Sequence, residues 1–162
     1  PYLRVAVGGI AVILLALILH TSDYLGLGEA ILKDSFVNAQ NPERFLMKMI
    51  FTCLTLSSGF KGAEIVPSLF IGATLGSALS SILALPANLC AGCGMVGVFC
   101  AVTNCPVSSM LIAAELFGFT GMPYYCVVIA VSYLISGYKS LYHAQTNVYS
   151  KTENKYVNRH TD

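Results

Sequence analysis

Residues 59–76 read GFKGAEIVPSLFIGATLG, a Gly-rich polar turn that runs directly into a long apolar stretch. Pro67 has no backbone N–H, so it suits the first turn of a helix, where that donor would have no partner within the helix. A helix that starts here directs several free N–H groups toward the turn. Because these groups carry partial positive charge, the stretch predicts an anion-binding site.

The composition of the chain is that of a membrane protein. Of its 162 residues, 56% are hydrophobic and 10% are charged, whereas soluble domains carry roughly 25% charged residues. The formal net charge is only +1, which gives no indication of a nucleic-acid partner, since such proteins carry a basic patch. We therefore predict a polytopic membrane protein in contact with the lipid bilayer.

Apolar runs alternate with polar breaks along the chain. We expect apolar or amphipathic segments at 5–19, 23–36, 45–58, 65–85, 89–102, 106–117 and 123–135, and a last helix that begins within 141–149. Several runs are shorter than the about 20 residues that a straight span of the bilayer requires. Non-helical backbone at membrane depth persists only where protein or a watery cavity surrounds it. The pattern predicts an all-α fold of tilted, broken and re-entrant helices, as in transporters and channels.

We expect two parts, a membrane domain over residues 1–149 and a polar tail over residues 150–162. Basic residues gather near the C-terminal end: Lys139, Lys151, Lys155 and Arg159. Because cytoplasmic segments carry an excess of Lys and Arg, this end is expected in the cytoplasm, beside a bacterial inner membrane. The first residue is not Met, so we expect the chain to be a piece of a longer protein.

The six cysteines lie in or beside apolar segments. Cys90 and Cys93 form a CxxC pair, but neither a second such pair nor a pair of histidines accompanies it. A zinc or redox site would need those partners. We interpret the cysteines as small packing residues and expect no metal and no cofactor.

Three separated stretches resemble the chloride channel and transporter (ClC) family. Residues 57–76 resemble the family's GxFxP anion-binding motif and the helix after it. Residues 91–117 resemble its Gly-rich helix, an X-Pro break and a helix that ends in a glutamate, and residues 137–149 resemble the start of its last membrane helix. The resemblance implies the second half of an inverted-repeat fold, in which a missing N-terminal repeat completes the anion site.

The resemblance also implies the ligands of the anion. The backbone N–H groups of Glu64 and Ile65 would face it, and the hydroxyl of Tyr142 would offer a neutral donor. The rest of the motif loop comprises Ala63, Val66 and Pro67. Ala63 stands where the family usually has Gly, and Ile65 where it usually has Phe. Without the resemblance, Tyr142 would be interpreted as an aromatic anchor at the membrane boundary.

Two carboxylates lie within the apolar region. Glu64 either stabilises the helix start, as a cap or as an ion-pair partner of Lys61, or tunes the access of anions or protons. Glu115 ends a short apolar helix, and we expect it to hydrogen-bond neighbouring backbone.

The function that the resemblance implies is transport of small anions, with chloride as the first substrate, by a channel or a proton/anion exchanger. A fluoride-selective member of the family is the alternative, because the GAEIVP loop is similar to that branch. The resemblance also implies a homodimer through the late helices, including Met110, Tyr124 and Val128.

Two other classes of function stay open. A membrane-embedded enzyme would need a cluster of polar catalytic groups. A purely structural membrane subunit would not need a Gly-rich break beside a proline.

Overall fold

A computed structural model of the chain describes residues 2–20, 24, 26–60, 64–138, 140–142, 145–151 and 155–160. This part of the chain forms seven helices and one antiparallel pair of short strands. The helices are α1 (Tyr2–Leu19), α2 (Glu29–Ser35), α3 (Glu43–Ser57), α4 (Ile65–Leu83), α5 (Ala87–Thr103), α6 (Pro106–Phe117) and α7 (Met122–Ile135), and the strands are β1 (Thr146–Tyr149) and β2 (Tyr156–His160).

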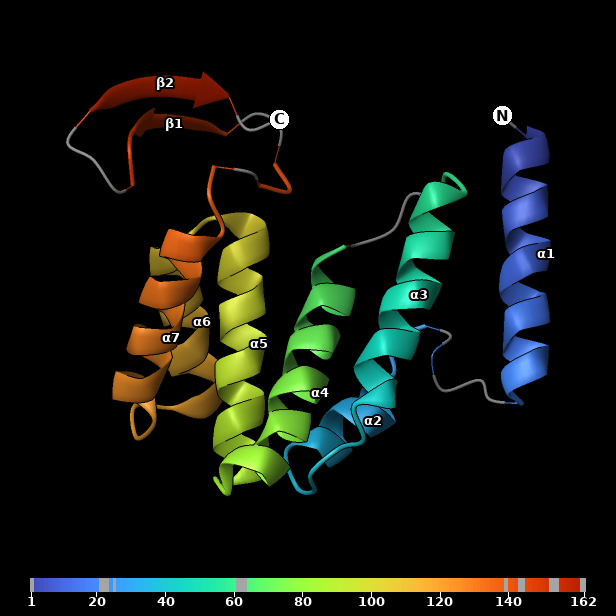
Figure 1. The fold of residues 1–162 in the computed structure, drawn as a ribbon, viewed down its shortest axis with the longest axis horizontal. Helices are drawn as coiled ribbons and strands as arrows, with labels where there is room; N and C mark the ends of the chain where they lie inside the picture. Colours follow the sequence, from blue (N-terminus) through green and yellow to red (C-terminus); the bar gives the residue numbers. More distant parts are fainter. Residues whose placement is uncertain are drawn as a thin grey trace.

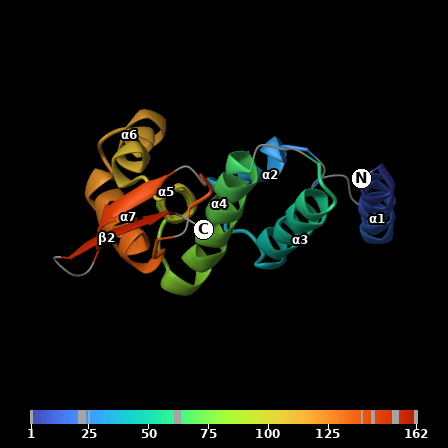
Figure 2. The same ribbon diagram turned by 90° about the horizontal axis from the view of Figure 1, so that it is seen from above.

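The helices stand in a row, in the order α1, α3, α4 and α5, with α6 and α7 packed against α5 at the far end (Figures 1 and 2). The short helix α2 contacts α4 and α5. The order α4, α5, α6, α7 follows the sequence because short turns join these helices. One of the described helices, Ile65–Leu83, is long and apolar enough to cross a membrane, and shorter apolar helices accompany it. This agrees with the predicted fold of short and broken helices.

Local sequence sets most helix limits. Helix α6 spans the predicted 106–117 because Pro106 opens it and Gly118, with a φ of 70°, closes it. The predicted amphipathic segment 23–36 is helical only from Glu29, because Gly26 and Gly28 have φ angles of 77° and 69° and break the helix before it.

The predicted last helix within 141–149 is wrong. Residues 146–149 form strand β1, in which Thr146 pairs with His160. Thr146 and Val148 are β-branched and favour extended backbone. The pairing joins residues on both sides of the expected domain limit at residue 149. The division into a membrane domain and a tail stays a prediction.

Several hydrogen bonds tie the hairpin to the helices. The Tyr138 hydroxyl, just after α7, bonds Ser150 Oγ (2.8 Å) and accepts from Lys151 N (3.3 Å). The ammonium of Lys151 makes the largest group of these contacts. Lys151 Nζ donates to Asn104 Oδ1 (2.5 Å), to the Tyr133 carbonyl (2.7 Å) and to Ser136 Oγ (3.2 Å). It also lies 3.8 Å from the centroid of the Tyr133 ring. These contacts place the hairpin at the C-terminal ends of α5 and α7.

The tightest helix contact joins α4 to α5 through glycines. A Cβ atom added at Gly76 would collide with the carbonyl of Cys90, and one added at Gly94 would collide with the carbonyl of Gly72. The two backbones therefore touch without intervening side chains, which fixes α4 against the rest of the helix row.

We expect Gly76→Ala to destabilise the protein by about 1–3 kcal/mol, because the new methyl group forces the two helices apart. Thermal or denaturant unfolding of the purified protein in detergent measures this. The matched control is Gly9→Ala, whose Cβ would meet Phe60 at an ordinary 3.8 Å. Equal stability of the two variants would contradict the tight contact.

We expect Lys151→Ala to release the hairpin, because three acceptors lose their donor at a cost of about 1–3 kcal/mol. Hydrogen exchange of the amides in residues 146–160 should become faster by one to two orders of magnitude, while exchange in α4 stays unchanged. The control is Lys155→Ala, since Lys155 is exposed on the same hairpin. Slow exchange in the Lys151 variant would show that other contacts hold the hairpin.

Candidate functional site

Helix α4 starts at the predicted motif, whereas the binding of an anion by the N–H groups of Glu64 and Ile65 stays a prediction. Glu64 is the residue before the helix, Ile65 is its first residue, and Pro67 lies in its first turn. Ser68 N donates to the Glu64 carbonyl at 3.3 Å. The N–H groups of Ile65 and Val66 come before that bond, where a helix has donors available for an external acceptor. Glu64 makes no side-chain capping bond to the helix.

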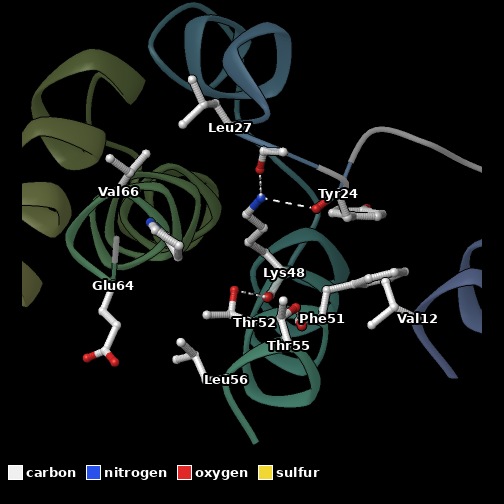
Figure 3. A pocket seen from close by; sticks show the side chains of 12 residues that line it. Val12, Tyr24, Leu27, Lys48, Phe51, Thr52, Thr55, Leu56, Glu64 and Val66 are labelled. Atoms are coloured by element: carbon white, nitrogen blue, oxygen red, sulfur yellow. Dashed lines mark hydrogen bonds between the residues drawn. The ribbon is translucent and has the colours of Figure 1, made fainter. Parts of the chain in front are cut away.

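A cavity of about 360 Å³ adjoins this helix start. Its walls come from α1, the segment before α2, α3 and the first turn of α4 (Figure 3). Most of the lining is apolar, and its charged side chains are Lys48 and Glu64. In Figure 3 the Lys48 ammonium and the Glu64 carboxylate point in different directions. The cavity thus brings together the predicted motif and a lysine.

Lys48 is the functional candidate that the sequence interpretation missed. Its side chain is 3% exposed, and its ammonium donates to the carbonyls of Gly26 (2.6 Å) and Tyr24 (3.1 Å). The available signal was a lone cation within the apolar run FLMKMIF of α3. A cation at such a position is expensive to bury and therefore marks a functional or pairing position in membrane proteins.

Tyr142 lies in the segment after α7, apart from the residues that line the cavity. This segment is held by the end of α5, since Leu141 N donates to the Val102 carbonyl (2.9 Å) and Ser140 Oγ to the Thr103 carbonyl (3.0 Å). The side chain of Tyr142 is 47% exposed. In Figure 1 the start of α4 and the segment after α7 both lie toward the upper side of the view, with α5 between the two helices. The role of the hydroxyl as an anion ligand stays a prediction.

Other predicted residues have mixed outcomes. Ala63 and Lys61 lie outside the described residues, so the Lys61–Glu64 ion pair is untested. Glu115 lies on an exposed face of α6. The structure shows no side-chain hydrogen bond from Glu115 within the part of the chain that it describes, which gives the expected backbone bond no support.

The cysteines differ in burial: Cys90 and Cys100 are buried, whereas Cys53 is exposed. Cys100 is fully buried in a cluster with Val96, Ala113, Tyr125 and Ile129. All six are free thiols. Within the described ranges, no group of three potential metal-ligating side chains comes together.

Residues 1–137 match the family described as voltage gated chloride channel. The chain belongs to this family. It is 43% identical over 128 residues to a chloride/fluoride channel protein of Pseudomonas syringae pv. tomato. These residues are 79% of the chain and 28% of that relative. A crystal structure of a CLC-type fluoride/proton antiporter matches with 35% identity and a TM-score of 0.80, over 85% of the chain and 35% of the antiporter.

Family membership confirms the resemblance and the class of fold. Members of the voltage gated chloride channel family are integral membrane proteins, so the apolar helices of this chain belong in a bilayer. The chain spans about a quarter to a third of the length of the relatives it matches.

Proposed function

We propose that this chain forms part of a membrane transporter of small anions and contributes one wall of its anion site. The observation that carries the proposal is the start of α4, where Glu64, Val66 and Pro67 line a cavity and the N–H groups of Ile65 and Val66 precede the first bond within the helix. Donors at a helix start stabilise an anion without a full opposite charge, which lets the ion leave again. The N-terminal repeat of the family would supply the facing wall.

We propose fluoride as the transported anion and exchange against protons as the mechanism, with chloride as the alternative. The sequence alone favoured chloride. Support for fluoride comes from both relatives, one a chloride/fluoride channel protein and the other a fluoride/proton antiporter. Proton exchange needs a group that takes up and releases a proton, and the carboxylate of Glu64 lies at the helix start where the anion would bind.

We further propose that the protein acts as a homodimer in a bacterial inner membrane, with its C-terminal end in the cytoplasm, and that it has no enzymatic activity. The predicted dimer residues differ in position. Tyr124 is exposed on α7. Met110 packs against the core cluster, and Val128 faces Gly97 of α5. Tyr124 is therefore the better candidate for a contact between subunits.

Flux from liposomes tests the function. The complete protein, reconstituted in liposomes loaded with fluoride or chloride, should release fluoride faster than chloride and move protons in the opposite direction. Faster release of chloride would overturn the choice of anion. Anion flux that a proton gradient does not drive would indicate a channel, and flux no greater than that of empty liposomes would overturn the proposed function.

We expect Glu64→Gln to reduce proton-coupled fluoride flux at least tenfold, because an amide of the same shape takes up no proton near neutral pH. The measurement is simultaneous recording of fluoride and pH outside the liposomes. Glu115→Gln is the matched control, since Glu115 is exposed on α6 away from the cavity. A Glu64 variant with the same coupled flux as the unmodified protein would leave this carboxylate only a structural role.

A further inference from the structure

Among the described residues, Lys48 is the charged residue that the fold buries. It lies on α3 and lines the same cavity as Glu64, although the two residues belong to different helices. Neither the motif nor the comparisons assign it a role.

The ammonium of Lys48 is held in place from three directions. The carbonyls of Gly26 and Tyr24 accept from it, at 2.6 and 3.1 Å. On the α4 side, Nζ lies 5.1 Å from the centroid of the Phe70 ring, which is itself fully buried. A cation fixed between two carbonyls and an aromatic face cannot turn away to solvent.

This charge has no opposite charge beside it in the part of the chain that the structure describes. The ion pairs there are Lys33–Glu29 within α2 and Arg44–Asp34 between α3 and α2, and Lys48 takes part in neither. Backbone carbonyls and an aromatic ring stabilise the ammonium but leave its net charge in the cavity wall. In a region of low dielectric constant, one unpaired charge acts over several ångströms.

The charge lies deeper along α4 than the motif does. Phe70 follows Ile65 by five residues, which corresponds to roughly 7 Å along the helix axis. The cavity therefore has Glu64 and the free N–H groups at one level and a fixed cation at another.

We propose that Lys48 supplies the positive charge that draws the anion into the cavity at the start of α4, and so sets the anion affinity of the transporter. This inference rests on the proposed anion transport. The charge of Lys48 offsets the repulsion between the anion and the Glu64 carboxylate. Lys48 acts through its charge at a distance, and the N–H groups at the start of α4 remain the direct donors to the anion.

Substitutions at Lys48 separate its charge from its hydrogen bonds. Lys48→Gln keeps N–H donors but removes the charge, whereas Lys48→Arg keeps both. In the complete protein, we expect Lys48→Gln to raise the fluoride concentration for half-maximal flux roughly ten- to fiftyfold, the size expected for one charge about 7 to 12 Å from the anion at an effective dielectric constant of about 20. The maximal rate should change less than twofold, and Lys48→Arg should restore the half-maximal concentration. Lys33→Gln is the control that should change nothing, because the Lys33 side chain on α2 is exposed.

A second variant keeps the test decisive if Lys48→Gln does not fold, which gel filtration and thermal unfolding in detergent would reveal. Thr55 lines the same cavity wall. Thr55→Glu adds a negative charge there and should raise the half-maximal concentration by a similar factor, whereas Thr55→Gln should not. An unchanged half-maximal concentration in Lys48→Gln, or in Thr55→Glu when the first variant is misfolded, overturns the inference. The proposed function would then stand, because it fails only if the unmodified protein transports no anion.

Discussion

The contact between the backbones of α4 and α5 is the constraint on which the rest of the structure depends. Gly72 and Gly76 on α4 meet Gly94 and the Cys90 carbonyl on α5 with no room for a methyl group. This contact sets the position of α4, and with it the direction in which the N–H groups at its start point. It also sets α5, against which α6 and α7 pack and to whose end Asn104 binds Lys151 of the hairpin. The candidate site and the C-terminal hairpin therefore share one support.

Much of the fold could be predicted from the sequence because local signals decide it. Proline at the start and glycine after the end define α6, and the apolar runs locate the other helices within a few residues. The helix expected within 141–149 failed for a local reason, since Thr146 and Val148 favour extended backbone, and for one that is not local. Its apolar and aromatic residues suit a helix, but Lys151 binds the ends of α5 and α7 and holds the chain as a hairpin. A sequence pattern does not show which distant carbonyls a lysine will reach.

The candidate site was predictable only in part. The motif located the start of α4 because Pro67 and the glycines before it act within a few residues of one another. The cavity beside it is built from α1, α3 and the segment before α2, so its existence depends on tertiary packing. The same holds for Lys48, which the sequence shows merely as a charge in an apolar run. Its role depends on two distant contacts. The carbonyl of Gly26, 22 residues before it in the chain, accepts from its ammonium, and the ring of Phe70 on α4 lies beside it.

Lys151 also brings three helix ends together. A buried or half-buried ammonium in a membrane protein needs polar partners, and here the protein itself supplies them. The same ammonium binds Asn104, which follows α5, and Ser136, which follows α7. Helix α6 begins two residues after Asn104, so its start lies next to the end of α5. One side chain thus joins the ends of two helices at the point where a third begins.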